Sequence, residues 1–288
     1  MSEQTNSRPE FIKDKTEPVS GVVQKPLTLF ERLSNLGWLR KTILLIVLAL
    51  IWQTYAVNLN NPLIFPTFLA TVDAFANAVL HGGLLGKAWH SIEILLMGYA
   101  IGLTCAAGLT IFAITTRVGS DLLETLTSMF NPLPAIALLP VALIWFGLGE
   151  GSIIFVLVHS VLWAVSLNTH SGFMGVSQTL RMVGRNYGLR GLRYVYKILV
   201  PAAFPSILTG LKVGWAFAWR TLIAAELVFG VSSGSGGLGW FIYESKNLLD
   251  IPAVFAGLFT IILVGLLVEN VVFHNIEIRT VKKWGMQH

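Results

Sequence analysis

The chain has 288 residues, of which 54% are hydrophobic and only 12% are charged, and its mean hydropathy is +0.70. This composition excludes a soluble globular protein and indicates an integral membrane protein of the all-α class. The formal net charge of +5 does not indicate nucleic-acid binding, because the cations flank apolar runs instead of alternating with aromatic residues on one polar face.

The chain begins with polar residues that show no periodicity. We expect residues 1–35 to form a cytoplasmic tail and residues 36–288 to form one transmembrane domain. Six apolar segments in this domain are long enough to cross the bilayer core as helices. They cover about residues 41–57, 91–114, 126–147, 152–170, 206–229 and 252–273.

Some of these segments and their connections carry special features. In the third segment, Pro132, Pro134 and Pro140 each remove a backbone donor, so this span is expected to be bent or broken and to face protein instead of lipid. Apolar residues at helical spacing over 68–80 predict a short amphipathic helix along the outer membrane face. The glycine-rich segment 231–247, which turns apolar toward its end, predicts a re-entrant or capping segment.

Several residues within the spans are interpreted as packing residues. Gly98 with Gly102, and Gly210 with Gly214, have the small-xxx-small spacing that allows helices to approach closely. His159 in the fourth segment is interpreted as a packed polar residue, because the six histidines of the chain are scattered.

The distribution of Lys and Arg predicts the orientation of the chain. Most of these residues lie in the terminal regions and in the loop 171–205, whereas the opposite side of the membrane carries only Lys87 and Lys246. Lys212 and Arg220 lie within the fifth segment, where Lys212 is close enough to its end to snorkel. Because cytoplasmic loops are enriched in cations, both termini and this loop are predicted to be cytoplasmic.

The loop 171–205 is longer than a simple connection and contains no acidic residue. Gly184, Gly188 and Gly191 divide it into short helical pieces. Its cations are Arg181, Arg185, Arg190, Arg193 and Lys197. This pattern indicates a docking surface; the alternative is a basic loop that rests on anionic lipid.

The sequence contains no motif for catalysis or metal binding. The stretch HGGLLGKA, from His81 to Ala88, is close to a phosphate-binding loop, but His81 replaces its first Gly and Ala88 replaces its Ser or Thr. No metal-spaced set of Cys and His residues is present. We therefore expect no metal, no cofactor and no enzymatic activity in this chain.

The loop resembles the cytoplasmic loop of binding-protein-dependent ABC importer permeases. That motif consists of Glu-Ala-Ala, a short spacer, a Gly and, further on, an apolar-Pro pair. Here Met182, Val183 and Gly184 occupy the Glu-Ala-Ala positions, Gly188 is the motif glycine, and LVPAAFP supplies the prolines. The glutamate and both alanines of the motif are absent.

Other stretches resemble the sulfonate, taurine and nitrate branch of that superfamily. They are NPLPAIALLPVALIWFGLGEGSIIFV from Asn131, SIEILLMGY from Ser91, TLIAAELVFG with Glu226, and GGLGWFIYES. Ile94 stands where the branch usually has Arg. The resemblance extends over about residues 60–273 and implies a type I ABC importer permease fold with about six transmembrane helices.

The resemblance also implies partners and a mechanism. Two permease subunits, expected to be a homodimer, would form the pore among the lipids of the bacterial inner membrane. Two separate ATPase subunits would hold ATP and Mg²⁺, and a periplasmic or lipid-anchored binding protein would deliver the substrate. The cytoplasmic loop would act as a lever between ATPase and pore. The expected coupling residues are Leu180, Arg181, Met182, Val183, Gly184, Arg185, Gly188 and Arg190.

A second group of residues is predicted to lie along the translocation pathway: Pro140, Trp219, Arg220 and Glu226. Because an arginine in the middle of a span costs about 2.5–3.5 kcal/mol, Arg220 must face a partner, water or substrate. An oxyanion would be attracted to it. The alternative is a structural ion pair of Arg220 with Glu226, Glu150 or Glu269.

The sequence thus predicts the permease subunit of an ATP-driven ABC importer for a small oxyanion, such as a sulfonate, taurine, nitrate or an aromatic carboxylate. One alternative is a secondary transporter driven by an ion gradient, which would need carboxylates at mid-membrane or paired inverted repeats. Another is a membrane-embedded enzyme, which would show clustered His, Asp or Ser residues at one interface.

Overall fold

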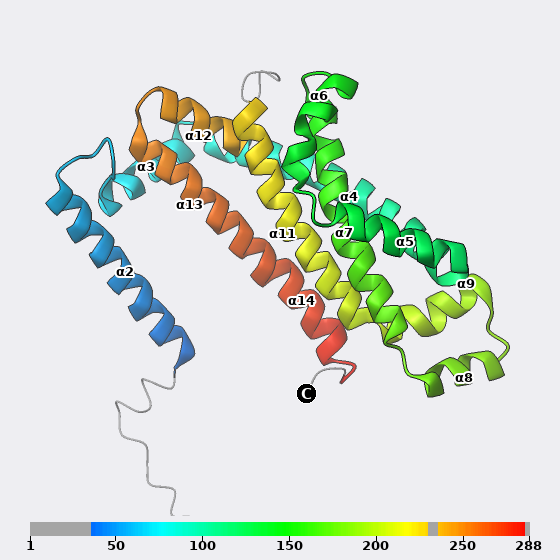
Figure 1. The fold of residues 1–288 in the computed structure, drawn as a ribbon. Coiled ribbons are helices and arrows are strands. Elements are labelled where there is room, and N and C mark those ends of the chain that lie inside the picture. Colours follow the sequence, from blue (N-terminus) through cyan, green and yellow to red (C-terminus); the bar gives the residue numbers. More distant parts are fainter. Residues whose placement is uncertain (1–35, 230–235, 286–288) are drawn as a thin grey trace, which may run out of the picture. The chain divides into compact units, whose positions relative to one another are not determined.

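The computed structural model describes residues 36–229 and 236–285, and all regular structure within these ranges is helical (Figure 1). The α-helices are α2 Gly37–Leu59, α3 Phe68–Leu80, α4 Leu84–Thr115, α5 Arg117–Phe130, α6 Leu139–Phe146, α7 Glu150–Met174, α8 Gln178–Asn186, α9 Gly191–Tyr194, α10 Val200–Ala202, α11 Phe204–Phe229, α12 Leu238–Asn247, α13 Ile251–Leu267 and α14 His274–Glu277. A 3₁₀ turn, η1, covers Ala135–Leu138, and π turns cover η2 Val195–Leu199, η3 Val268–Phe273 and η4 Ile278–Lys282.

The described helices provide up to six membrane spans, which confirms an all-α membrane fold. Four of them, Gly37–Leu59, Leu84–Thr115, Glu150–Met174 and Ile251–Lys282, are long and apolar enough to cross a bilayer alone. Two further spans are bent pairs of helices. The predicted tail, residues 1–35, and residues 231–235 of the predicted glycine-rich segment lie outside the described residues, while α12 covers residues 238–247 of that segment.

The third span is broken, as its prolines predict. Helices α5 and α6 meet at an angle of 88° across a break of no more than four residues. Pro132 and Pro134 lie in the break, and Pro140 lies in the first turn of α6, where a missing N–H has no cost. A hydrogen bond of 3.0 Å from the Ser152 hydroxyl to the carbonyl of Ala142 ties α6 to α7.

The chain divides into two compact units, residues 1–51 and 52–288, and the boundary between them lies within α2. In the first unit, the described part of α2 is apolar and its side chains are largely exposed, as is usual for a helix in contact with lipid. In the second unit, Trp52 donates a hydrogen bond of 2.9 Å to the carbonyl of Pro66. Its ring packs against Phe65, Phe68 and Phe255.

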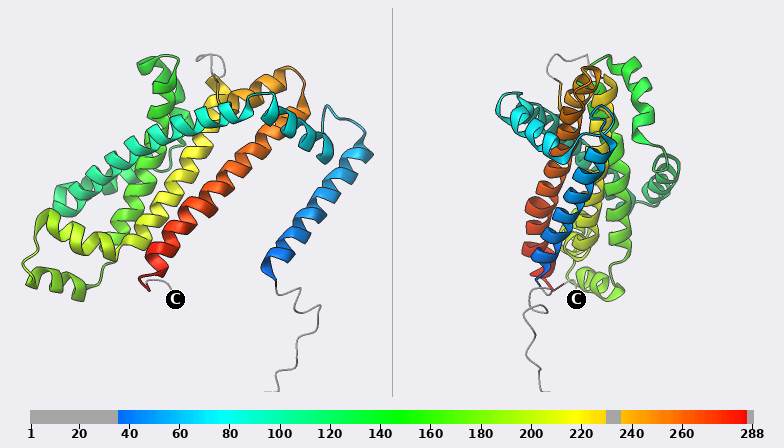
Figure 2. Two further views of the ribbon diagram at one scale, coloured as in Figure 1. Left: turned by 180° about the vertical axis from the view of Figure 1, so that it is seen from behind. Right: turned by 90° about the vertical axis from the view of Figure 1, so that its left-hand side faces the viewer.

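The core of the second unit is formed where α7 packs against both α4 and α11 (Figures 1 and 2). Glycines make this approach possible, as their spacing predicts. A Cβ atom on Gly98 would lie 2.7 Å from Leu157 Cβ, and one on Gly102 would lie 2.8 Å from Val161 Cβ. On α11, a Cβ atom on Gly214 would lie 2.9 Å from a Val165 methyl group. The helices are therefore in direct contact through backbone surface.

We expect Gly102→Ala to lower the thermal unfolding temperature of the purified protein in detergent. The new methyl group would overlap with Val161, and such overpacking typically costs about 1–3 kcal/mol. Gly108 on the same helix is the matched control, because a Cβ atom there meets nothing within 4 Å. Gly108→Ala should leave the unfolding temperature unchanged or raise it slightly, since Ala is the better helix former. Equal effects of the two substitutions would contradict close packing at Gly102.

An ion-pair network connects α11 to the last span. Lys212 on α11 contacts Glu277 at 2.8 Å and Glu269 at 3.6 Å, and Glu277 also contacts Lys282 at 3.8 Å. Lys212 is therefore held by two carboxylates instead of only extending toward water as expected. Glu269, a possible partner of Arg220 in the sequence analysis, is engaged here.

Candidate functional site

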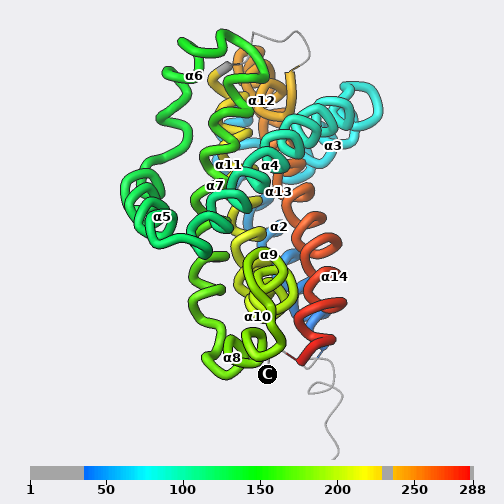
Figure 3. Tube along the Cα trace, turned by 90° about the vertical axis from the view of Figure 1, so that its right-hand side faces the viewer, coloured from blue at the N-terminus to red at the C-terminus, as the bar shows by residue number. Residues whose placement is uncertain are grey.

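Six of the eight predicted coupling residues, 180–185, lie on a short helix, α8, that follows the end of α7, and the other two, Gly188 and Arg190, lie just after this helix. Figure 3 shows α8 at the end of the helices where α14 also ends, opposite α6 and α12. The helix begins at a standard cap, because the Ser177 side chain accepts a hydrogen bond from the backbone N–H of Leu180 at 3.4 Å. Its end is equally well defined. Gly188 has φ +70°, its N–H bonds to the carbonyl of Arg185 at 2.9 Å, and the N–H of Leu189 bonds to the carbonyl of Gly184 at 3.1 Å. This is a Schellman motif, in which glycine is favoured by the left-handed backbone.

One side of α8 is fixed to the rest of the protein. The Arg181 guanidinium donates to the carbonyl of Phe173 at 2.6 Å and to that of Val176 at 3.0 Å. These carbonyls belong to the last turn of α7 and to the residues just after it. Gly184 is buried, and a Cβ atom there would lie 2.9 Å from both Tyr194 and Ile198. Arg181 and Gly184 therefore hold α8 in place against α7 and η2.

Four large apolar or aromatic side chains of α8 and its C-cap are exposed, beside the polar side chains of Gln178, Thr179 and Asn186. The exposed fractions are 37% for Leu180, 59% for Met182, 41% for Val183 and 82% for Tyr187. Leu180, Val183 and Tyr187 follow the i, i+3, i+7 spacing of one helix stripe, which also contains the buried Gly184, whereas Met182 projects from a different side of the helix. We call these four residues the α8 face. The exposed side chains of Arg185 and Arg190 lie beside it.

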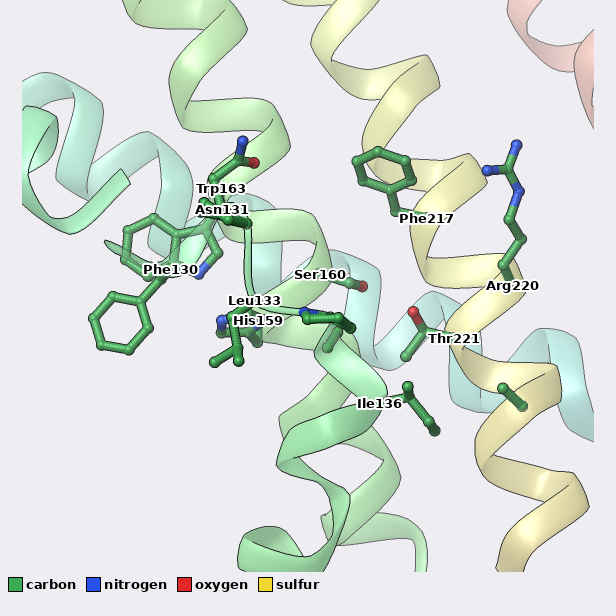
Figure 4. A pocket seen from close by; sticks show the side chains of 14 residues that line it. Phe130, Asn131, Leu133, Ile136, His159, Ser160, Trp163, Phe217, Arg220 and Thr221 are labelled. Atoms are coloured by element: carbon green, nitrogen blue, oxygen red, sulfur yellow. The ribbon is translucent and has the colours of Figure 1, made fainter. Parts of the chain in front are cut away.

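A pocket of about 390 Å³ lies between the break in the third span, α7 and α11 (Figure 4). It is lined by Phe130, Asn131, Pro132, Leu133, Pro134, Ala135, Ile136, His159, Ser160, Trp163, Phe217, Arg220, Thr221 and Ala224. In Figure 4, Phe217 and Thr221 project from α11 toward Asn131 and Ser160, while the Arg220 side chain points away from them. Arg220 is exposed and therefore lies at the rim of the pocket.

Rings form the inner wall of this pocket. Phe130 and Trp163 are stacked, with ring centroids 5.4 Å apart and planes inclined by 11°. His159 meets both rings edge-on, at 6.2 Å from Phe130 and 6.0 Å from Trp163. Both ring nitrogens of His159 and the indole N–H of Trp163 are buried and have no hydrogen-bond partner.

Glu226 lies away from this pocket in a hydrogen-bonded cluster and is only 5% exposed. The hydroxyl of Ser91 lies 2.7 and 2.9 Å from its two oxygens and donates to the carboxylate. The N–H of Gly239 donates to Glu226 Oε2 at 2.8 Å, and the N–H of Leu238 donates to Ser91 Oγ at 2.9 Å. Glu226 and Ser91 thus cap the first turn of α12, where an anion is favoured.

Residues 98–275 match the model of the family described as "binding-protein-dependent transport system inner membrane component". The chain belongs to this family of ABC importer permeases. One relative, named as an ABC transporter permease protein of Methanocaldococcus jannaschii, is 33% identical over 76% of this chain and 83% of its own.

Further relatives of this permease place it in the sulfonate, taurine and nitrate branch. A chain of Bacillus subtilis, named as an aliphatic sulfonates transport permease protein, is 28% identical over 86% of this permease and 88% of its own length. The nitrate import permease protein of a Synechocystis strain is 29% identical over 81% of this permease and 86% of its own length. The matched family consists of transport permeases and not of enzymes.

The residues predicted for the pathway do not form one site. Arg220 is the member of the group that lines the pocket. Pro140 is exposed on α6, Trp219 is buried beside Gly265, and Glu226 caps α12. Among the described residues Arg220 has no ion pair, so the expected alternative, a structural pair with a glutamate, is not formed within one subunit.

Sequence reasoning missed most of the pocket. Phe217 and Thr221 could have been found, since they share a helix face with Arg220. His159 packs against Phe130 and Trp163 as interpreted, and its ring also lines the pocket although neither of its nitrogens has a hydrogen-bond partner. A histidine inside an apolar span is itself a signal for a functional site. Asn131 lines the pocket because the backbone is broken between α5 and α6, and Trp163 lines it because of the way α7 packs. Neither arrangement can be read from the local sequence.

Proposed function

We propose that this permease is the membrane subunit of an ATP-driven importer of a small oxyanion. Two copies form the pathway in a bacterial inner membrane, with both termini in the cytoplasm. Two separate ATPase subunits carry ATP and Mg²⁺, and an external binding protein delivers the substrate. The observation that carries the proposal is the α8 face, a set of exposed large side chains on a capped helix that is held against α7 and η2.

The composition of the α8 face fits a protein partner better than water. Met, Tyr and Arg are the residue types enriched at the centres of protein interfaces. Leu180, Val183 and Tyr187 are spaced like the anchors of a helix that lies in a groove. Arg185 beside them provides charge that can orient the partner. A loop that only rested on lipid headgroups would need the cations but not the ordered helix with its defined start and end.

The attachment of α8 suits the transmission of a movement. Arg181 connects the start of α8 to the end of α7, and Gly184 connects its middle to η2, which continues through α10 into α11. A displacement of α8 therefore acts on two spans that also pack against each other. Helix displacement of this kind is a common way for nucleotide-driven closure to be converted into opening at a distance.

The substrate class follows from the charge within the membrane and from the relatives. Arg220 is a cation on a transmembrane helix with no ion pair among the described residues, and such residues commonly mark a substrate pathway. Relatives named for sulfonate, nitrate and taurine transport fit an anionic substrate. We therefore assign a small oxyanion as cargo.

Reconstitution in liposomes tests the proposal. We expect the purified permease alone to leave an imposed gradient of an oxyanion such as an alkanesulfonate undissipated. After addition of its ATPase and its binding protein, ATP hydrolysis should become dependent on the binding protein. Transport by the permease alone, driven by an ion gradient, would show a secondary transporter and refute the proposal.

A further inference from the structure

A basic pocket of about 490 Å³ lies where α4 meets α5, beside the end of α7, α8 and η2. Arg117, Arg181 and Arg185 line it, and none of its fourteen lining residues is Asp or Glu. The carboxylates that follow Arg117 on α5, Asp121 and Glu124, are not among these residues. None of the three arginines forms an ion pair among the described residues. Because like charges around one cavity repel one another, an anion between them would be favoured.

One of these cations is held in place by the protein itself. Arg181 donates from Nε to the carbonyl of Val176 at 3.0 Å and from Nη2 to that of Phe173 at 2.6 Å, while its Nη1 makes no hydrogen bond among the described residues. The side chains of Arg117, at the start of α5, and Arg185, on α8, are exposed. An anion in the basic pocket would therefore meet one fixed guanidinium and two adaptable ones from different helices. This arrangement suits the several oxygens of a phosphate group.

An apolar slot of about 300 Å³ lies next to the basic pocket, and Val195 lines both cavities. Ten of the twelve residues that line the slot are apolar, and the other two are threonines. From Leu103 to Ile111, α4 lines the slot, and from Ala113 onward it lines the basic pocket. Since α4 is a membrane span, the slot extends from the basic pocket toward the membrane interior. Ala107, one of the residues that line the slot, is exposed on the outside of this span.

We infer that the basic pocket and the apolar slot together form a binding site for one anionic phospholipid. Its phosphate lies among the three arginines, and part of one acyl chain lies in the slot. A free anion would leave the slot without contact, and an apolar molecule would leave the arginines without a counter-ion. Basic pockets between transmembrane helices near the membrane surface are suited to acidic lipid headgroups. The inference does not depend on the substrate of the importer and requires only that this end of the helices lies at a membrane surface.

Native mass spectrometry of the purified full-length permease, delipidated in neutral detergent, tests the lipid site. The probes are dioleoyl phosphatidylglycerol, which is anionic, and dioleoyl phosphatidylcholine, which is zwitterionic and has the same acyl chains. We expect phosphatidylglycerol to bind about tenfold or more tightly than phosphatidylcholine. Arg117→Gln should weaken phosphatidylglycerol binding by about fivefold, because one cation is lost. Ala107→Phe places a ring in the slot and should weaken binding by about threefold or more.

Arg279→Gln is the matched control, since Arg279 is exposed on η4, has no ion pair among the described residues and lines neither cavity. It should bind phosphatidylglycerol like the unmodified permease. Arg117 and Ala107 are also exposed, so neither substitution is expected to unfold the chain. Equal binding of the two lipids, binding that is indifferent to Arg117→Gln and Ala107→Phe, or an equal loss in Arg279→Gln would overturn the lipid site. Displacement of the lipid by inorganic phosphate would also overturn it and would show a site for a free anion.

Discussion

Deletion of residues 180–191 is expected to abolish association of the permease with its ATPase subunits while membrane insertion remains intact. The deletion removes the whole α8 face with the Schellman motif that ends α8, but it leaves every apolar span in place. Co-purification from detergent-solubilised membranes measures the association, and carbonate extraction measures insertion. A deletion protein that still purified with its ATPase would show that docking occurs elsewhere.

A single substitution makes the same test without shortening the chain. Met182 is 59% exposed, so Met182→Asp places a charge in the docking surface with little expected effect on the fold. We expect the affinity for the ATPase to fall about 30-fold or more, which corresponds to about 2 kcal/mol for an interface anchor. Leu248→Asp is the control, because Leu248 is 74% exposed next to α12, at the opposite end of the helices. An equal loss in both variants would indicate general damage instead of a docking site.

Replacement of Glu226 is expected to cause a large loss of stability. Glu226→Leu leaves the Ser91 hydroxyl and the N–H of Gly239 without their acceptor in a buried place. Because each unpaired buried group costs about 1–3 kcal/mol, we expect a loss of about 3 kcal/mol in stability and loosening of α12. Thermal unfolding and hydrogen exchange over residues 238–247 measure the two effects.

Two further variants identify the cause. Glu226→Gln retains one acceptor oxygen, so its loss should be clearly smaller than that of Glu226→Leu. Glu244→Gln removes a carboxylate from α12 itself, where Glu244 forms a half-exposed ion pair with Lys87 at 2.9 Å. Its effect should stay below about 1 kcal/mol, as is usual for surface pairs. If Glu226→Leu unfolded no earlier than Glu244→Gln, Glu226 would not hold α12.

The membrane fold could be predicted because its signals are local in sequence. Apolar runs give the spans, and Pro132 and Pro134 give the break in the third one. The predicted boundaries of the spans were less accurate. The second span begins at Leu84 and not near residue 91, since a polar stretch can continue a helix once its first turns pack. The last span continues to Lys282 through π turns, partly because Lys212 pairs with its glutamates.

The candidate sites, too, could be predicted only where their signals are local in sequence. The start of α8 at Ser177 and its end at Gly188 follow from local capping chemistry, so the coupling helix was predictable. Glu226 and Ser91 are 135 residues apart, and nothing in either local sequence indicates their hydrogen bond. The pocket needs three separate elements and a broken backbone, so the sequence could suggest Arg220 but not Trp163 or Asn131.

Photo-crosslinking from position 182 in intact membranes tests most directly whether α8 is the docking helix of a cytoplasmic ATPase. With a photoreactive amino acid in place of Met182, we expect an adduct of permease and ATPase that disappears when the ATPase is not expressed. The same amino acid at position 248 should give no such adduct. Absence of the ATPase adduct at position 182, or labelling of that position by a membrane-impermeant reagent added outside intact cells, would contradict the proposed mechanism.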